Sequence, residues 1–477
     1  MELKAALQRI ADVVGPSGLA DPASAQGMLT DERGLYRGAA ALVVRPASTA
    51  ECAAVVRICH EAGIGVVPQG GNTGYCGGAT PFDAPGRTQI LLSLARLNRV
   101  REVDPVDFTM TAEAGVVLAN AQAAAREHGL LFPLSMGSEG SCQIGGNIAT
   151  NAGGLAVLRY GTMRDLVLGL EVVLPTGDML SELKALRKDN TGYDLKSLFV
   201  GSEGTLGVIT AAVLKLFPAP RSRETAWLAV PSVEAACRLL ARARRESGDQ
   251  VVSAEYVARG SLDLVLRHVE GARDPLDAPH EHYVLLEFAS ADEQTVLRER
   301  LERVLATGLE AGEIADGVIA ESHAQRAALW RLRERVPEAE RHAGGSVKHD
   351  ISVAISKIPE FLRRAAAELE RVAPHRLSVF GHIGDGNLHY NVLPPEGSGI
   401  DALRAEFGPA LSDAVHALAV ALGGSFSAEH GVGILKAAEL ERFEPPPALE
   451  AMRAVKRALD PRGIMNPGKV LRSFEAR

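Results

Sequence analysis

The sequence predicts an α+β protein of two or three domains, and three observations lead to this prediction. The chain has 477 residues, more than one hydrophobic core normally supports. Strand-like and helix-like patterns of apolar residues alternate along most of it. A break at Pro218-Ala219-Pro220 separates an N-terminal part rich in glycine loops from a middle part of regular elements. We expect domains at residues 1–218, 219–426 and 427–477.

The composition excludes several classes of protein. The chain is 46% hydrophobic and 23% charged, with a net charge of −8 and both signs interspersed. It therefore lacks the basic footprint of a nucleic-acid binder. No apolar run approaches a membrane span, and the N-terminus lacks the apolar core of a signal peptide, so we expect a cytoplasmic protein. The five cysteines show no metal-ligand spacing, which favours reduced core residues.

The N-terminal part begins with a strand, a helix and a strand. A short apolar strand at 42–44 precedes a helix that starts with the capping box of Ser48 and Glu51 and ends at Gly63. A second strand follows at 64–67. Further strands are predicted at 89–94, 109–114, 167–174, 179–180 and 208–217, and an alanine-rich helix at 118–128.

The middle part alternates between short strands and amphipathic helices. The patterns predict strands at 227–230, 251–256 and 283–288, and helices at 233–246, 261–269 and 293–306. One sheet with the helices on one face gives a domain of ferredoxin-like type. After Pro445-Pro446-Pro447, a last helix is predicted at 449–459.

The most informative segment is a predicted β-hairpin at 380–391. A turn of four residues at 384–387 makes His382 and His389 cross-strand partners on one face, which Asn391 shares. Further along, Glu429 and His430 add a carboxylate and a third imidazole. Two histidines and a carboxylate with one open position are typical of a catalytic metal centre. The spacing equally allows histidines that only bind the backbone through hydrogen bonds.

Three glycine-rich loops each lie beside a predicted strand. The first, at 69–78, has five glycines in ten residues, and Thr80-Pro81 prevents a helix from following it. Taken alone it also fits a flexible surface turn. A second loop at 137–154 and a third at 201–207 favour an anion-binding function, because glycine amides approach a phosphate closely. Together the loops indicate one long phosphate-containing ligand.

These loops, the hairpin, residues 187–194 and the tail Asn466-Pro467-Gly468-Lys469 resemble the D-2-hydroxyacid dehydrogenase branch of the vanillyl-alcohol oxidase superfamily. The resemblance runs from about residue 41 to residue 471, with the motifs in the family's order. It implies a two-subdomain FAD-binding domain, a ferredoxin-like substrate (cap) domain, and a C-terminal helical segment that returns to the flavin. It also implies oxidation of a D-2-hydroxy acid, with D-2-hydroxyglutarate as the nearest match, to the 2-oxo acid.

The resemblance implies FAD bound non-covalently, because the first loop has no histidine and Cys76 falls outside the usual attachment position. The residues implied to bind FAD are Gly70, Gly71, Asn72, Thr73, Gly74, Gly77, Gly78, Gly137, Ser138, Gly145, Gly146, Asn147, Thr150, Asn151, Gly153, Gly154, Gly161, Glu203, Gly204, Ile209 and Asn466.

The same resemblance assigns chemical roles. It implies a divalent metal, commonly zinc, on His382, His389 and Glu429, and His430 is the candidate general base. Substrate contacts are expected from three residues: Arg333, Lys348 and Asn391. The opposing interpretation is a structural His430 and arginines that face solvent, paired with neighbouring glutamates. Pro337 departs from the hydroxyglutarate-type pattern, which has threonine there.

Other functions stay open at this point. The same scaffold serves D-lactate dehydrogenases, and an accessory flavin subunit of a multi-protein oxidase or a metal hydrolase are candidates of other classes. The metal-binding residues argue against the accessory subunit, which does not need them. The three glycine-rich loops argue against the hydrolase, which has no use for them. The expected partners are a small D-2-hydroxy acid and an electron acceptor, either an electron-transfer flavoprotein or a quinone-type or dye-type compound. A homodimer fits the resemblance; nucleic acid and a membrane span are not expected.

Overall fold

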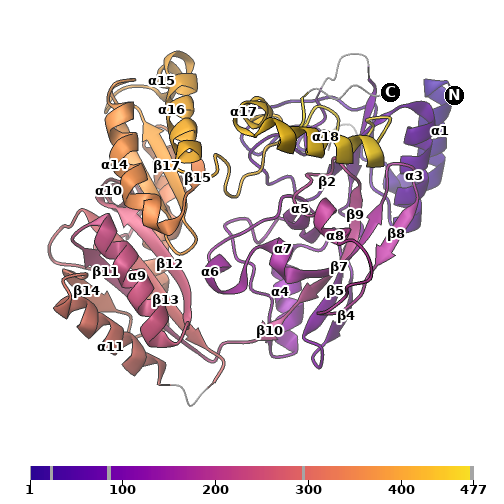
Figure 1. The fold of residues 1–477 in the computed structure, drawn as a ribbon. Coiled ribbons are helices and arrows are strands. Elements are labelled where there is room, and N and C mark those ends of the chain that lie inside the picture. Colours follow the sequence, from indigo (N-terminus) through magenta and orange to yellow (C-terminus); the bar gives the residue numbers. More distant parts are fainter. Residues whose placement is uncertain (1, 22–24, 83–86, 293–295, 473–477) are drawn as a thin grey trace. The chain divides into compact units, whose positions relative to one another are not determined.

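The computed structural model describes residues 2–21, 25–82, 87–292 and 296–472 (Figure 1). The chain forms two compact units. The first comprises residues 1–154, 161–219 and 429–477, and the second comprises residues 155–160 and 220–428. We had expected residues 155–160 in the first unit and a boundary at 426. Within the described ranges, no helix is long and apolar enough to cross a membrane.

The first unit contains a three-stranded parallel sheet of order β1-β3-β2. Its strands are β1 (Leu42–Val44), β2 (Gly65–Gln69) and β3 (Gln89–Ser93), and it packs with α1 (Leu3–Val14) and α3 (Thr49–Ala62). Ser48 caps α3 by accepting a hydrogen bond from the Glu51 amide, and Gly63 ends the helix with a φ of 69°. The Glu51 carboxylate accepts from the Ala47 amide, one residue before the predicted position. The predicted strand, helix and strand are thus present.

A second, antiparallel sheet of this unit has the order β4-β5-β9-β7-β8. Its strands are β4 (Val100–Asp104), β5 (Thr109–Glu113), β7 (Val167–Val173), β8 (Met179–Glu182) and β9 (Val208–Lys215). A short pair joins β6 (Leu130–Leu131) to β10 (Phe217–Pro218). The helices are η1 (Pro16–Gly18), α4 (Leu118–Glu127), α5 (Ile144–Ala149), α7 (Met163–Leu166) and α8 (Lys196–Phe199).

The C-terminal segment completes the first unit with α17 (Ala437–Phe443) and α18 (Pro446–Leu459). At the end of α18, the buried Lys456 donates to Asp460, to the Thr205 carbonyl and to the Met465 carbonyl. Met465 then forms a parallel bridge with Val66 of β2. These bonds fix residues 460–466 against the strand from which the first glycine loop leaves.

The second unit is built on a seven-stranded antiparallel sheet of order β14-β11-β13-β12-β16-β17-β15. Its strands are β11 (Ser222–Val230), β12 (Val251–Ala258), β13 (His282–Ser290), β14 (Asp316–Ile319), β15 (Asp350–Ser352), β16 (Arg376–His382) and β17 (Asn387–Leu393). Its helices are α6 (Val157–Tyr160), α9 (Val233–Ser247), α10 (Arg259–His268), α11 (Leu297–Glu310), α12 (His323–Glu334), α13 (Val336–His342), η2 (Ile355–Lys357), α14 (Ile358–Leu369), α15 (Ile400–Glu406) and α16 (Gly408–Ala421). The first three residues of the helix predicted at 293–306 lie outside the described residues.

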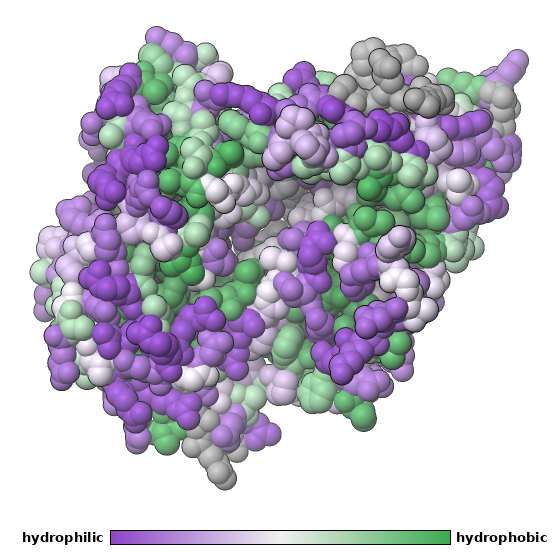
Figure 2. Space-filling model, in the orientation of Figure 1, coloured by the Kyte–Doolittle hydropathy of each residue, from purple (hydrophilic) through white to green (hydrophobic). Residues whose placement is uncertain are grey.

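Both faces of this sheet are covered, whereas the sequence predicted helices on one face only. Alternate strand residues enter two cores, since neighbouring side chains point to opposite faces. One face packs against α9, α11, α14 and α16, and the other against α10, α12 and α13. Hydrophilic side chains prevail over the outer side of α9 and α11 (Figure 2). The second face carries the polar residues of the candidate site.

Candidate active site

The three glycine loops meet within the first unit. A Cβ atom on Gly71 of the first loop would lie 2.1 Å from the Ser141 carbonyl oxygen of the second loop. Amides of the third loop donate to the end of α5, from Gly201 to Ile148 and from Glu203 to Ala149, over 3.0 and 2.8 Å. The expectation that the loops serve one ligand therefore has a structural basis, because they form one connected surface.

The Asn466 side chain joins the tail to two of these loops. Its Nδ2 atom donates to the Gly78 carbonyl (2.9 Å) and to the Glu203 carbonyl (2.7 Å). The Glu203 carboxylate accepts from the amides of Val432 and Gly433, over 2.7 and 2.8 Å. Burial raises the pKa of Glu203 even though two amides stabilise its charge. Glu203 therefore holds the C-terminal segment, a role that the sequence did not indicate.

Several predicted cofactor residues support the loops themselves. The Asn147 amide contacts the Cys142 thiol, Thr150 donates to the Gly146 carbonyl, and Asn151 accepts from the Arg164 amide. Ile209 is buried in β9. The side chains of these residues shape the cradle, so a cofactor would meet chiefly the backbone of the loops.

The cradle has the space and polar groups that a dinucleotide needs. Cβ atoms added to Gly74, Gly137 or Gly146 would meet no protein atom within 4 Å. Among the described residues, three buried polar atoms on these segments have no hydrogen-bond partner: Gln143 Oε1, Asn466 Oδ1 and Lys469 Nζ. Buried groups without partners are unfavourable, and a bound FAD would supply acceptors and donors. The residues present thus fit the cofactor.

The hairpin is present in the second unit, but with another register. Phe380 pairs with His389, whereas the sequence predicted His382 as the partner. The turn lies at residues 383–386, closed by a bond from the Gly386 amide to the His382 carbonyl, one residue earlier than predicted. The pairing therefore moves by two residues, which keeps both histidines on the same face. Their ring centroids are 5.8 Å apart.

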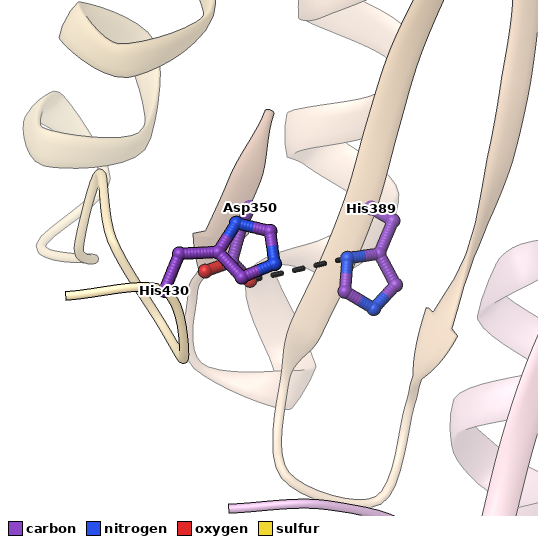
Figure 3. A group of neighbouring side chains, drawn as sticks. All are labelled: Asp350, His389 and His430. Atoms are coloured by element: carbon purple, nitrogen blue, oxygen red, sulfur yellow. Dashed lines mark ion pairs between the residues drawn. The ribbon is translucent and has the colours of Figure 1, made fainter. Parts of the chain in front are cut away.

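Asp350 lies beside this histidine pair on the neighbouring strand. It is the cross-strand partner of His389, and its Oδ1 atom is 4.0 Å from His389 Nδ1 (Figure 3). The side chain of Asn387 donates from Nδ2 to the same carboxylate oxygen over 2.8 Å. Burial raises the pKa of the nearby Asp385 to about 6, and the charges of Glu255 and Asp350 add to this. The sequence analysis did not single out Asp350.

Glu429 and His430 follow directly on the last residue of the second unit. The amide of Ala428 donates to the Asp350 carbonyl over 3.2 Å, which holds Ala428 beside β15. Two sets of possible ligand atoms each lie within 4.8 Å of one another: the first is His382, His389 and Glu429, and the second is Asp350, His389 and His430. Figure 3 shows the second set. The first set consists of the three residues that the sequence selected.

Arg333 is buried at the end of α12 and forms an ion pair on the same face. Its Nε atom donates to Glu255 Oε2 over 2.8 Å, and its guanidinium lies 4.8 Å from the centroid of the Phe380 ring. Arg331 and Arg335, its neighbours in the sequence, are exposed. Pro337 stands in the first turn of α13, where proline needs no amide partner, so it separates α13 from the helix that carries Arg333.

Lys348 and Asn391 share a second buried glutamate. Lys348 Nζ lies 3.4 Å from Glu340 Oε2, and the Asn391 amide donates to both oxygens of Glu340, over 2.9 and 3.1 Å. Asn391 also accepts from the His349 amide. The interpretation of solvent-facing arginines is wrong for Arg333, which is buried and pairs with a glutamate of a distant strand, although each predicted substrate cation does have a glutamate partner.

His430 packs against the first glycine loop within the first unit. Its ring meets Tyr75 edge to face, with centroids 5.0 Å apart, and the Arg33 guanidinium lies 4.6 Å from the Tyr75 centroid. Cys76, the next residue, donates its thiol to the Gly431 carbonyl. The candidate base and the loop are therefore fixed to each other.

Sequence reasoning assigned Glu255 no role, and it considered Glu340 only as one of the glutamates that could pair with the arginines. Glu255 and Glu340 are 1% and 0% exposed, and each binds a residue that the sequence did select. A signal existed for Glu255, because it is the only charged residue in the apolar run at 251–257. For Glu340 the sequence offered only a pairing with basic residues, and its bond to Asn391 could not be foreseen, since it stands in a helix among other charged residues.

Comparisons with known proteins match both parts of the chain. A family model described as "FAD binding domain" matches residues 40–181, and one described as "FAD linked oxidases, C-terminal domain" matches residues 219–470. These matches confirm the predicted FAD-binding domain.

Relatives match over most of the chain. A D-2-hydroxyglutarate dehydrogenase of Xanthomonas citri is 40% identical over 91% of this chain and 90% of its own. The mitochondrial D-2-hydroxyglutarate dehydrogenase of Arabidopsis thaliana is 39% identical over 93% of this chain and 77% of its own. The structure of p-cresol methylhydroxylase shares the fold, with a TM-score of 0.74 at 16% identity over 98% of this chain and 96% of its own. The chain therefore belongs to the FAD-linked oxidases of the vanillyl-alcohol oxidase type, in the group that contains the D-2-hydroxyglutarate dehydrogenases.

Proposed function

We propose that the chain oxidises D-2-hydroxyglutarate to the 2-oxo acid, using non-covalently bound FAD and a divalent metal on His382, His389 and Glu429. One observation carries the proposal: the ligand atoms of these residues lie within 4.8 Å of one another. Relatives about 40% identical that bear the name of this activity support the choice of substrate.

The donor set suits a catalytic metal. Two imidazoles and a carboxylate leave a coordination position for substrate, as in catalytic zinc sites, so zinc is our first candidate. Glu255 accepts from His382 Nδ1, so a metal would bind this ring through Nε2.

The balance of charge around the hairpin also favours a cation. Glu255, Glu340 and Asp350 are three carboxylates, and each is at most 1% exposed. They stand against two cations, Arg333 and Lys348. A divalent ion beside these carboxylates would add positive charge, which favours a dicarboxylate substrate. The proposed metal would therefore support diacid binding as well as activate the hydroxyl.

The chemistry divides among few groups. When bound, FAD accepts the hydride from C2, and the divalent metal polarises the substrate hydroxyl. His430 takes the hydroxyl proton, so the C2–H and O–H bonds break as the C=O bond forms and two electrons leave with the hydride. Arg333 keeps its two Nη groups for a carboxylate, because the Glu255 bond uses Nε. Lys348 and Asn391 are the proposed further substrate contacts.

D-Lactate is the alternative substrate on this scaffold. The Glu340 bond partly neutralises Lys348, and Pro337 offers no hydroxyl, so the second carboxylate of a diacid has fewer contacts than the resemblance implied. The buried Arg333 still favours a diacid, since a desolvated guanidinium loses a partner when the ligand has only one carboxylate.

A panel of D- and L-hydroxy acids with an artificial dye acceptor tests this proposal. We expect oxidation of D-2-hydroxyglutarate, or a related diacid such as D-malate, well above D-lactate, and inert L-isomers. Comparable kcat/KM for D-lactate and the diacids would favour the lactate function, and no bleaching of the flavin by any hydroxy acid would favour an accessory subunit. The electron acceptor, a homodimer and a cytoplasmic location stay predictions.

A further inference from the structure

The buried Glu255 holds two proposed functional residues with one carboxylate. It lies in β12, is 1% exposed, and uses both oxygens. Oε1 is 2.8 Å from His382 Nδ1, and Oε2 is 2.8 Å from Arg333 Nε. Burial alone would raise the pKa of Glu255, but the positive charges of His382 and Arg333 outweigh this effect and lower it.

Each contact orients its partner. A carboxylate only accepts hydrogen bonds, so His382 must carry its proton on Nδ1 and turn Nε2 away from Glu255. Arg333 has its Nε fixed, which aims the remaining fork of the guanidinium away from β12. A shift of the Glu255 side chain would therefore move the metal ligand and the substrate arginine together.

We propose that Glu255 is a positioning residue that links metal affinity to substrate affinity through His382 and Arg333. This inference rests on the proposed function. Arg333 and His382 both donate to one carboxylate, so each hydrogen bond lowers the negative charge that is available to the other. Weakening one contact should therefore strengthen the other.

A neighbouring strand offers a matched control. Glu287 of β13 is 3% exposed and binds Arg223, Thr225, Arg326 and Trp330, but its bonds reach none of the proposed metal or substrate residues. Glu287→Gln likewise removes a buried carboxylate that pairs with arginine, here with the half-buried Arg223 and Arg326. General damage to the sheet should affect both variants equally.

The decisive experiment measures zinc affinity by competition with a chelator, and KM and kcat at saturating zinc, in the FAD-loaded protein. Glu255→Gln should lower zinc affinity by roughly 10–100-fold and raise KM for D-2-hydroxyglutarate more than it lowers kcat. Glu287→Gln should leave both unchanged. Wild-type zinc affinity and KM in Glu255→Gln, or equal losses in the control, would overturn the proposal.

A second variant tests the link if Glu255→Gln does not fold. Arg333→Met frees Glu255 for His382 and removes a nearby positive charge, so zinc should bind several-fold more tightly without substrate. Unchanged or weaker zinc binding would contradict the link. His389→Ala separates the two proposals: if it keeps wild-type zinc affinity, the metal site itself is wrong.

Discussion

His430 combines a proposed chemical role with a fixed position. Tyr75 packs edge to face against its ring, and Arg33 covers Tyr75. Aromatic pairs of this geometry add about 0.5–1.5 kcal/mol beyond their buried area, enough to restrict the imidazole. The base is thus positioned by the glycine loop as well as by its own backbone.

Replacing His430 by asparagine should lower turnover by ~10²–10⁴-fold, because asparagine keeps some hydrogen bonding but cannot take a proton. Steady-state kinetics with D-2-hydroxyglutarate measure the effect, and flavin and zinc content should equal those of the wild type. Tyr75→Phe, which keeps the ring contact, is the control and should turn over nearly normally. A His430→Asn protein of normal rate would move the base elsewhere.

Lys469 should make the stability of the FAD-free protein depend on pH. Burial lowers the pKa of its ammonium from the usual 10.5 to about 7. Between these values the native state holds it neutral while the unfolded state stays protonated. Unfolding therefore takes up a proton, and this contribution to stability rises with pH.

We predict that Lys469→Met is more stable than the wild type at pH 7 in the FAD-free form, and that the gap in Tm narrows by pH 9. Between pH 7 and pH 9, the difference in free energy of unfolding between the two proteins should shrink by on the order of 2 kcal/mol. Thermal melts at both pH values measure it. A gap independent of pH would show that Lys469 has a partner in the folded protein.

At the scale of elements, sequence patterns predicted many of the strands and helices but not how they pair, and the helices between residues 323 and 443 were not predicted. Strands and helices were found because apolar periodicity and caps are local, as in the helix from Ser48 to Gly63. The hairpin register was wrong by two residues, because the turn position depends on the bonds that close it. The histidines still share a face, because a shift of an even number of residues keeps each side chain on its face of the sheet.

The contact between the first and second glycine loops gives an element-scale prediction. A methyl group on Gly71 would collide with the Ser141 carbonyl, whereas one on Gly140 meets no protein atom within 4 Å. Gly71→Ala should therefore lose FAD on purification and Gly140→Ala should keep it. The ratio of flavin to protein absorbance measures both. Full flavin content in Gly71→Ala would show that the loops can separate without harm to the cradle.

At the scale of the whole molecule, sequence reasoning could not assemble the units. Residues 155–160 belong to the second unit, where Arg159 donates to the Ala289 carbonyl, although the surrounding loop belongs to the first. Glu255 and Glu340 reach the site from strands and helices far along the chain. Such partners arise from tertiary packing, which no local pattern encodes. The resemblance to a family therefore named the proposed metal and substrate residues, but not the carboxylates that bind some of them.

The central claim is that the metal on His382, His389 and Glu429 is required for oxidation of D-2-hydroxyglutarate. Anaerobic bleaching of the flavin by this substrate tests it most directly, measured in zinc-loaded, demetallated and re-zincated protein that keeps its FAD. We predict rapid bleaching with zinc, none without it, and recovery on adding zinc, since the metal would polarise the substrate hydroxyl and add positive charge beside three buried carboxylates. Bleaching at the full rate in demetallated protein would contradict the account.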